Sequence, residues 1–491
     1  MPEKLSNRRL PALPASVLRP SYDRSLVTPG IVHLGVGAFH RAHQAAYVDD
    51  CIAAGETGWG IVGASLQSAS TAEALDPQDG LYTLAVRGGE TETLRVIGSI
   101  GQMLVAPRNP AALLDALSDP GIRIVTLTIT EKAYLRNASG DLDQTHPGIV
   151  ADLADPAHPR TAHGFLVEAL ARRRASGTEP FTILSCDNLP SNGATLHRLL
   201  IQFAALRDAA LAAHVETVSC PSSMIDRIVP ATTDADRARI SEALGVEDAW
   251  PIVTEPFSQW VVEEKFPGGR PAWEKFGVTM VRDVSPFEEM KLRLLNGAHS
   301  SIAYLGLLAG HDTVAKSFGD PAIRAFVQAL WAEAAATLPD DAGLDTQRYV
   351  RELTERFDNT ALAHRTAQIA NDGSQKLPQR IIGTALDRLS AGASADRLML
   401  AIAAWIRAAE LRGTNLPANH FTDPLDSRLA ALPPGQPSHD TVRAIFEMAG
   451  FAAGSDQRAA LEAVTSRHLD ALRKGGVPTA LAAFSSGGET A

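Results

Sequence analysis

Cysteine is scarce in this chain: only Cys51, Cys186 and Cys220 occur among its 491 residues. The three lie far apart and form no C-x-x-C pair, which excludes a disulfide framework and a cysteine-rich zinc site. This usage fits a reducing compartment, so we expect a cytoplasmic protein. The sequence also shows no residue cluster at metal-ligand spacing, and we expect no metal ion at its functional site.

Long hydrophobic runs are absent as well. No uninterrupted apolar run approaches the roughly 20 residues needed to cross a bilayer. The N-terminal stretch MPEKLSNRRLPALPASVLRP is polar and broken by proline, unlike a signal peptide. We therefore expect neither a membrane-spanning segment nor a membrane partner.

Positive charge is in deficit: 45 Lys and Arg residues stand against 56 Asp and Glu residues, for a net charge of −11. Nucleic-acid binders need a basic surface, so we expect no nucleic-acid partner. A small anionic substrate needs only one or two local cations and is not excluded. The length exceeds one ordinary core, which predicts two or three domains. The oligomeric state stays open between a monomer and a small homo-oligomer.

Short apolar runs alternate with amphipathic stretches in the first half of the chain. The runs GIVHLGVG, WGIVGASL, IRIVTLTIT and FTILSCDN are rich in β-branched residues and bounded by turn residues, as buried strands are. Between them GFLVEALARRRASG predicts a helix that ends at Gly177. This alternation predicts an α/β fold with a doubly wound, mostly parallel sheet and ligands at the carboxyl ends of its strands.

The pattern changes near FPGGRP, residues 266–271. One more strand-like piece, GVTMVRD, follows, and from Ser285 onward runs such as DRLMLAIAAWIRAAELRG predict helices almost to the end of the chain. We therefore predict an α/β domain over residues 1–284 and a mainly α-helical C-terminal domain over residues 285–491.

The stretch IVHLGVGAFHRAH, residues 31–43, carries part of a dinucleotide-binding fingerprint. A strand pattern precedes it and a helical pattern follows, an arrangement that points amide groups at a pyrophosphate. We predict a cofactor loop made of Gly35, Val36, Gly37, Ala38, Phe39, His40 and Arg41. His40 replaces the third glycine and keeps helix and strand apart, while Arg41 is expected to supply charge to the phosphate. The alternative is a turn without a ligand.

The residue that selects the cofactor's ribose should follow the second strand. That position reads Ser65-Leu66-Gln67-Ser68, with neither an acidic residue nor a basic cluster. The sequence therefore makes no choice between NAD and NADP.

The segment SPFEEMKLRLLNGAHSSIAYLG predicts a helix that begins at residues 285–286. Ser285 and Glu288 form a capping box, with Pro286 at the first helical position. Glu288 has two possible roles, as a helix cap or as a proton relay, and the sequence leaves both open.

A wheel drawn for this helix gathers four polar side chains. At about 100° per residue, Glu288, Asn296 and His299 lie about 60°, 140° and 80° from Lys291. Burial is expected to lower the pKa of Lys291 from its usual value of about 10.4 towards values useful for proton transfer. Taken singly, Lys291 is typical of a surface lysine, and His299 is typical of a hydrogen-bonded core histidine. Together, beside a domain boundary, the four favour a functional site.

A second polar cluster, SCDNLPSNG, spans residues 185–193 at the end of a predicted strand. Parallel sheets place ligand contacts there, and Asn188 is suited to donate its side-chain amide to a substrate oxygen. The alternative is that Asn188 only forms the turn before Leu-Pro.

At these residues the chain resembles the mannitol dehydrogenase family of polyol-specific long-chain dehydrogenases. The resemblance spans nearly the whole sequence and rests on GVGAFHRAH (35–43), TITE (128–131), SCDN (185–188), KLRLLNGAHS (291–300) and DGSQKLP (372–378). It implies a metal-independent, NAD- or NADP-dependent enzyme with an N-terminal Rossmann-type domain and a mainly helical C-terminal domain.

The resemblance also implies roles for individual residues. Lys291 corresponds to the general acid/base, and Asn188 and Asn296 hold the reacting oxygen. His299 orients a neighbouring hydroxyl, and Glu288 relays the proton to solvent. Two further positions, Asp226 and Lys376, match residues that contact substrate.

Two departures from the mannitol-oxidising members bear on the substrate. Residues 130–134 read TEKAY, with Lys132 where those members have glycine, and Gln368 stands where they have arginine. Both features resemble the fructuronate reductase branch of the family, and a lysine near the nicotinamide end of the cleft suits a substrate with a carboxylate. The expected reaction is therefore the interconversion of D-fructuronate and D-mannonate. The alternatives are mannitol 2-dehydrogenase or related polyol chemistry, and a non-catalytic nucleotide-binding module.

Overall fold

The computed structural model describes residues 3–339, 343–416, 420–451 and 454–485. The chain divides into two compact units, residues 1–285 and 286–491. Among the described residues, no helix combines the length and the apolar character that crossing a bilayer requires.

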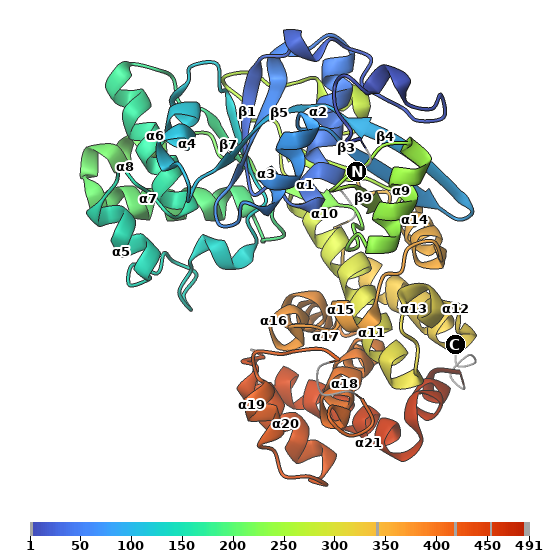
Figure 1. Cartoon of the computed structure of the whole chain (residues 1–491). Helices are drawn as coiled ribbons and strands as arrows, with labels where there is room; N and C mark the ends of the chain where they lie inside the picture. Colours follow the sequence, from blue (N-terminus) through green and yellow to red (C-terminus); the bar gives the residue numbers. More distant parts are fainter. Residues whose placement is uncertain (1–2, 340–342, 417–419, 452–453, 486–491) are drawn as a thin grey trace. The chain divides into compact units, whose positions relative to one another are not determined.

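A five-stranded parallel sheet forms the centre of the first unit, in the order β5-β2-β1-β6-β7 (Figure 1). Its strands are β1 (Pro29–Leu34), β2 (Gly60–Ser65), β5 (Ile100–Val105), β6 (Ile124–Leu127) and β7 (Thr182–Ser185). Counted along the chain this order is 3-2-1-4-5, which is the strand order of the Rossmann fold. The predicted doubly wound sheet is therefore confirmed.

Helices cover both faces of this sheet. Successive side chains of a strand point to opposite faces, so Val32 and Leu34 of β1 join one apolar core and Ile31 joins the other. The first core includes residues of α4 (Pro110–Ser118), α6 (Ala162–Ser176), α7 (Asn192–Arg207) and α8 (Ala209–Glu216), and the second includes α2 (Gln44–Ala53). Burial on both faces explains why the strands read as continuous apolar runs. The helix predicted to stop at Gly177 is α6, and Gly177 has the left-handed φ of +71°.

Two three-stranded sheets contain the other strands among the described residues of the first unit. One has the order β11-β10-β8, from β8 (Ser223–Asp226), β10 (Gln259–Glu263) and the predicted strand β11 (Thr279–Val281). The other has the order β4-β3-β9, from β3 (Tyr82–Gly88), β4 (Thr91–Ile97) and β9 (Ile252–Thr254). The remaining helices are α1 (Ala38–Ala42), α3 (Ser70–Leu75), α5 (Pro147–Ala154), α9 (Asp234–Leu244), and the 3-10 turns η1 (Leu10–Ala12), η2 (Arg24–Leu26), η3 (Thr57–Trp59), η4 (Asp76–Gln78), η5 (Glu131–Tyr134) and η6 (Trp273–Phe276).

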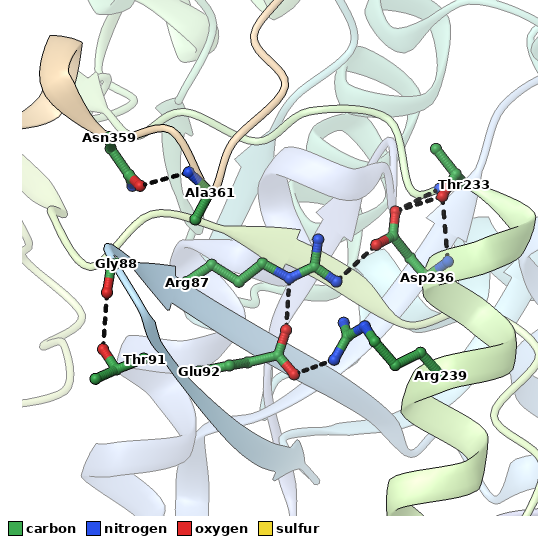
Figure 2. Close-up of polar contacts among 9 residues, drawn as sticks. All are labelled: Arg87, Gly88, Thr91, Glu92, Thr233, Asp236, Arg239, Asn359 and Ala361. Carbon is green, nitrogen blue, oxygen red and sulfur yellow. Dashed lines mark hydrogen bonds and ion pairs between the residues drawn. The ribbon is translucent and has the colours of Figure 1, made fainter. Parts of the chain in front are cut away.

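An ion-pair network ties the β3–β4 hairpin to α9 (Figure 2). The guanidinium of Arg87 lies between Glu92 and Asp236, at 2.5 and 2.6 Å, and Arg239 also contacts Glu92. Asp236 belongs at the same time to the capping box that starts α9 at Thr233. Charges on three elements therefore neutralise one another, and the hairpin is held to α9 close to its turn.

The second unit contains helices and, among its described residues, no strand longer than an isolated bridge. In order they are α10 (Ser285–Met290), η7 (Lys291–Asn296), α11 (Gly297–Ala309), α12 (Val314–Gly319), α13 (Pro321–Ala335), α14 (Thr346–Asp358), α15 (Thr366–Ile369), α16 (Gly373–Leu377), η8 (Pro378–Ile382), α17 (Gly383–Ser390), α18 (Asp396–Leu411), α19 (Asp426–Ala430), α20 (Ser438–Met448) and α21 (Ser455–Ser485). The apolar α18 packs against α11 and α21, as its composition predicts. The expectation of a mainly helical second half is confirmed.

Candidate active site

The predicted cofactor loop joins β1 to α1 where the strand order reverses, between β1 and β6. Gly35 has a φ of +92°, and a Cβ there would overlap the carbonyl oxygen of Thr128. Gly37 differs: a Cβ would meet only the carbonyl oxygen of Gly35, at 3.8 Å. Gly35 therefore makes the tight turn, and Gly37 leaves open space beside the backbone. This division of roles fits a dinucleotide at the switch point of the sheet.

A pair of stacked imidazoles replaces the third glycine of the fingerprint. The rings of His40 and His33 lie 3.4 Å apart with only 12° between their planes, and both side chains are fully buried. Nδ1 of His33 meets Thr126 Oγ1 at 2.7 Å, and its Nε2 meets Thr128 Oγ1 at 2.9 Å. Burial lowers the pKa of His33 to about 3, and burial together with the neighbouring His33, Arg41 and His43 holds the pKa of His40 well below its usual range. Two neutral rings thus fill the gap that a glycine would close.

The structure corrects the role expected for Arg41. Its side chain is 1% exposed, and Nη1 donates to the carbonyl oxygen of Trp250 at 2.5 Å. The guanidinium carbon lies 5.2 Å from the ring centre of Tyr82, whose hydroxyl donates to the Arg41 carbonyl oxygen. The guanidinium is committed to the interior of the first unit, so only the backbone of Arg41 is available to the loop.

The carboxyl end of β7 carries the second predicted cluster, and the carboxyl end of the neighbouring strand β6 leads to Lys132. Asn188 follows β7 and is exposed, and Lys132 lies on η5, which follows β6. Lys132 is also exposed and forms no ion pair with any residue that the structure describes. Asp226 is the last residue of β8 and is 4% exposed, so it belongs to a neighbouring sheet of the same unit.

A buried carboxylate that the sequence analysis did not identify lies between these loops. Asp187 accepts the backbone N–H groups of Ile129 and Thr130, at 3.1 and 2.9 Å, and the hydroxyl of Tyr134 at 2.8 Å. Burial raises the pKa of Asp187, against the lowering effect of these hydrogen bonds. The signal for it was present, since Asp187 is the third letter of SCDN.

Thr130 has an unusual backbone. Its φ of +71° and ψ of 155° fall in a region that is essentially reserved for glycine. Such a conformation costs about 1–3 kcal/mol and persists only where the surroundings enforce it. For a β-branched residue this is a genuine outlier.

The helix predicted from SPFEEMKLRLLNGAHS begins at Ser285, one residue before the predicted start at Pro286. Asp283 Oδ1 accepts the N–H of Ser285 at 2.9 Å and so caps the first turn. The helix is not uniform, because residues 291–296 form the π-helix η7. Trp331 Nε1 donates to the Leu294 carbonyl oxygen of this segment at 2.9 Å.

The π-helix corrects the wheel drawn from the sequence. A π turn takes up about one residue more than an α turn, so residues beyond it rotate back by about 100°. Asn296 and His299 then lie about 40° and −20° from Lys291 instead of about 140° and 80°. The three side chains share a narrower arc than predicted, and each is 7–9% exposed. Glu288 precedes the π-helix and is half-buried.

His299 lies in a cationic environment. Its ring is 5.2 Å from that of His364, at 90°, and 4.8 Å from that of Phe357. Burial first, and then His364, Arg356, Arg380 and Lys291, hold the pKa of His299 well below its usual range. Its Nε2 is buried with no hydrogen-bond partner among the described residues, so His299 is not a hydrogen-bonded core histidine.

His364, Arg356 and Arg380 are neighbours of His299 that the sequence analysis missed. His364 and Arg380 flank the DGSQKLP motif (372–378), at the two ends of the stretch HRTAQIANDGSQKLPQR, so the surroundings of the motif contained a signal for them. Arg356 carried none. Burial and Arg356 lower the pKa of His364 to about 4.

The other two predicted substrate contacts lie near one another in sequence. Lys376 is on α16, and its Nζ donates to the Asn371 carbonyl oxygen at 2.7 Å. Gln368 is on α15 and exposed. The structure describes no group of three or more His, Cys, Asp or Glu side chains, within the part it covers, that could hold a metal ion.

Comparison with known proteins decides the family. A model of the mannitol dehydrogenase Rossmann domain matches residues 29–275, and one of the mannitol dehydrogenase C-terminal domain matches residues 283–472. The chain belongs to the mannitol dehydrogenase family. It is an oxidoreductase, and the resemblance predicted from its motifs is confirmed.

Three relatives define the range of activities nearby. The D-mannonate oxidoreductase of Escherichia coli (strain K12) is 42% identical over 442 residues, 89% of this chain and 91% of that protein. The mannitol 2-dehydrogenase of Cereibacter sphaeroides is 44% identical over 400 residues, 80% and 83%. The Pseudomonas fluorescens mannitol 2-dehydrogenase, in a ternary complex with NAD and D-mannitol, has a TM-score of 0.89 at 38% identity, covering 99% of this chain and 100% of that one. Identity alone does not separate these substrates.

Proposed function

We propose that this member of the mannitol dehydrogenase family interconverts D-fructuronate and D-mannonate, with NAD(H) as cofactor. The observation that supports this substrate is Lys132, which follows the carboxyl end of the parallel strand β6. Its ammonium is exposed and has no counter-ion among the described residues. Ligands of doubly wound sheets bind at that edge, and an unneutralised cation there favours a carboxylate-bearing sugar. The fit of Gly35 and Gly37 favours a dinucleotide cofactor, and the NAD complex of the Pseudomonas enzyme favours NAD.

The proposed chemistry divides among a few side chains. Bound NAD(H) supplies or accepts the hydride at the substrate carbon. Lys291, as an ammonium, protonates the developing alkoxide, and the amides of Asn188 and Asn296 hold that oxygen. By analogy with oxyanion donors, each amide contributes about 2–4 kcal/mol. His299 orients a neighbouring hydroxyl as a neutral imidazole, consistent with its lowered pKa.

The supporting side chains complete the assignment. Glu288 relays the proton between Lys291 and solvent. Asp226, Lys376 and Gln368 contact the substrate. These roles follow the family resemblance, residue by residue.

A substrate panel tests the proposal. The purified protein is assayed with fructuronate, tagaturonate, fructose and xylulose, each with NADH and with NADPH. We expect the highest kcat/KM for fructuronate with NADH. A preference for fructose would replace the proposal with mannitol 2-dehydrogenase activity. NADH binding without turnover of any of the four would support a nucleotide-binding module.

Lys132→Ala tests the residue behind the proposal. A charge-assisted bond to a carboxylate contributes about 1.5–3 kcal/mol, so kcat/KM for fructuronate should fall about 10- to 150-fold. Residual activity on neutral fructose should hardly change. The matched control is Lys275→Ala, which removes another exposed lysine from a four-residue 3-10 turn, η6, of the same unit. Equal losses on both substrates would assign Lys132 to the fold or the cofactor.

A further inference from the structure

We propose that Asp187 is a positioning residue for substrate recognition: its carboxylate holds residues 129–134 in the strained conformation that presents Lys132 beyond β6. The inference rests on the proposed function for the role of Lys132, and on the structure for the conformation.

Asp187 brackets the segment that bears Lys132. Two of its hydrogen bonds come from the start of the segment, the N–H groups of Ile129 and Thr130, and the third comes from its end, the hydroxyl of Tyr134. Glu131, Lys132 and Ala133 lie between these points, on η5. A single carboxylate therefore fixes both ends of the short turn on which Lys132 stands.

The residue with the strained backbone, Thr130, is also a hydrogen-bond donor to Asp187. Thr130 has the glycine-like φ of +71° and ψ of 155°, and its own N–H is one of the three donors to Asp187. Left to itself, a threonine relaxes to negative φ, and this relaxation turns the following residues away. The hydrogen bonds to Asp187 oppose that relaxation.

Asp187 is itself held rigidly. Cys186, directly before it, donates its N–H to the Leu127 carbonyl oxygen at 2.8 Å, which continues the β6–β7 pairing. The Asn192 side chain donates to the Asp187 carbonyl oxygen at 2.9 Å. On the far side, Tyr134 is fully buried, and its hydroxyl also lies 2.6 Å from Ser185 Oγ. The carboxylate is thus carried by the sheet and acts on a loop.

The test compares Asp187→Asn with a matched carboxylate. Asp152 holds another loop of the same unit in the same way, accepting the N–H groups of Arg160 and Thr161, at 2.7 and 2.9 Å, and the Thr161 hydroxyl at 2.6 Å. Asp152→Asn therefore makes the same carboxylate-to-amide change, which replaces one acceptor oxygen by a donor, at a comparable set of three hydrogen bonds away from β6 and β7.

The first readout is independent of activity. Trypsin cleaves after Lys132 only when residues 129–134 leave their turn, and mass spectrometry identifies the fragment that begins at Ala133. We expect this cleavage to be at least about tenfold faster in Asp187→Asn and unchanged in Asp152→Asn. An unchanged rate in Asp187→Asn would overturn the proposal.

The second readout is kinetic. Asp187→Asn should raise KM for fructuronate about tenfold with kcat and the KM for NADH within about twofold, and should add little in a Lys132→Ala background. An effect that multiplies with that of Lys132→Ala would show that Asp187 acts elsewhere. If the wild-type protein prefers fructose, the proposed function is wrong. The cleavage experiment still tests whether Asp187 holds residues 129–134 in their turn.

A rescue variant covers the case in which Asp187→Asn folds poorly. Glycine adopts the backbone angles of Thr130 without strain, so Thr130→Gly should restore most of the folding and of the fructuronate KM lost in Asp187→Asn. Failure to rescue either property would refute the link between Asp187 and the Thr130 conformation.

Discussion

His163 should make the first unit sensitive to acid. The side chain is 1% exposed on α6, with its ring 6.4 Å from that of Phe203. Neither ring nitrogen has a hydrogen-bond partner among the described residues, and burial lowers the pKa of His163 from 6.5 to about 4. The folded protein therefore keeps this imidazole neutral down to about pH 4, whereas the unfolded chain protonates it below about pH 6.5.

The magnitude follows from this difference in proton binding. As the pH falls from 7 to 5, only the unfolded chain binds the proton, so the free energy of unfolding falls. At 1.36 kcal/mol per pKa unit, the 1.5 units between pH 6.5 and pH 5 amount to about 2 kcal/mol. His163→Leu removes the titrating group at similar volume, and its free energy of unfolding should fall about 2 kcal/mol less than that of wild type over this range.

Urea unfolding followed by circular dichroism, at pH 7 and pH 5, measures the effect. The matched control is Phe203→Leu, which disturbs the same packing without removing a titratable group and should lower the free energy of unfolding equally at both pH values. The same pH dependence in His163→Leu and wild type would refute the burial of a neutral imidazole at this position.

Three further outcomes are expected. Lys291→Met should lower kcat at least about 100-fold with the circular dichroism spectrum retained, and a much smaller loss would mean that another group transfers the proton. Gly35→Ala should destabilise the fold, because its positive φ and the overlap with Thr128 leave no room for a methyl group. Gly37→Ala should keep the wild-type melting temperature and weaken NADH binding at least about tenfold. Equal melting temperatures of the two variants would contradict these separate roles. Exhaustive chelation with EDTA should leave activity unchanged, and a loss restored by zinc would contradict the lysine-based mechanism.

The site was predictable where one local pattern carries the information. Gly35 and Gly37 stand between a strand and a helix in sequence, and the turn that they form needs only local geometry. Lys291, Asn296 and His299 were grouped by helical period alone, and the grouping survives even though the period is wrong. The π-helix that corrects it depends on packing, including the bond from Trp331 to the Leu294 carbonyl oxygen, which no local pattern announces.

Other features depend on neighbours that are distant in sequence. The place of Arg41 in the fingerprint predicts a contact with a phosphate. Its guanidinium instead donates a hydrogen bond to a carbonyl oxygen more than 200 residues away in sequence. Asp187 reaches across from β7 to a loop that precedes it by nearly 60 residues. Neither contact can be predicted from the helical or strand periodicity of the sequence.

The sequence by itself determined the alternation of strands and helices in the first half, the division into an α/β half and a helical half, and the family. Those properties are written in hydrophobic periodicity and in short motifs, which act along the chain. Only the tertiary structure decided which charges face inward, which imidazoles stay neutral, and which carboxylate holds the strained Thr130. Burial and hydrogen-bond partners set these properties, and both come from segments that folding brings together.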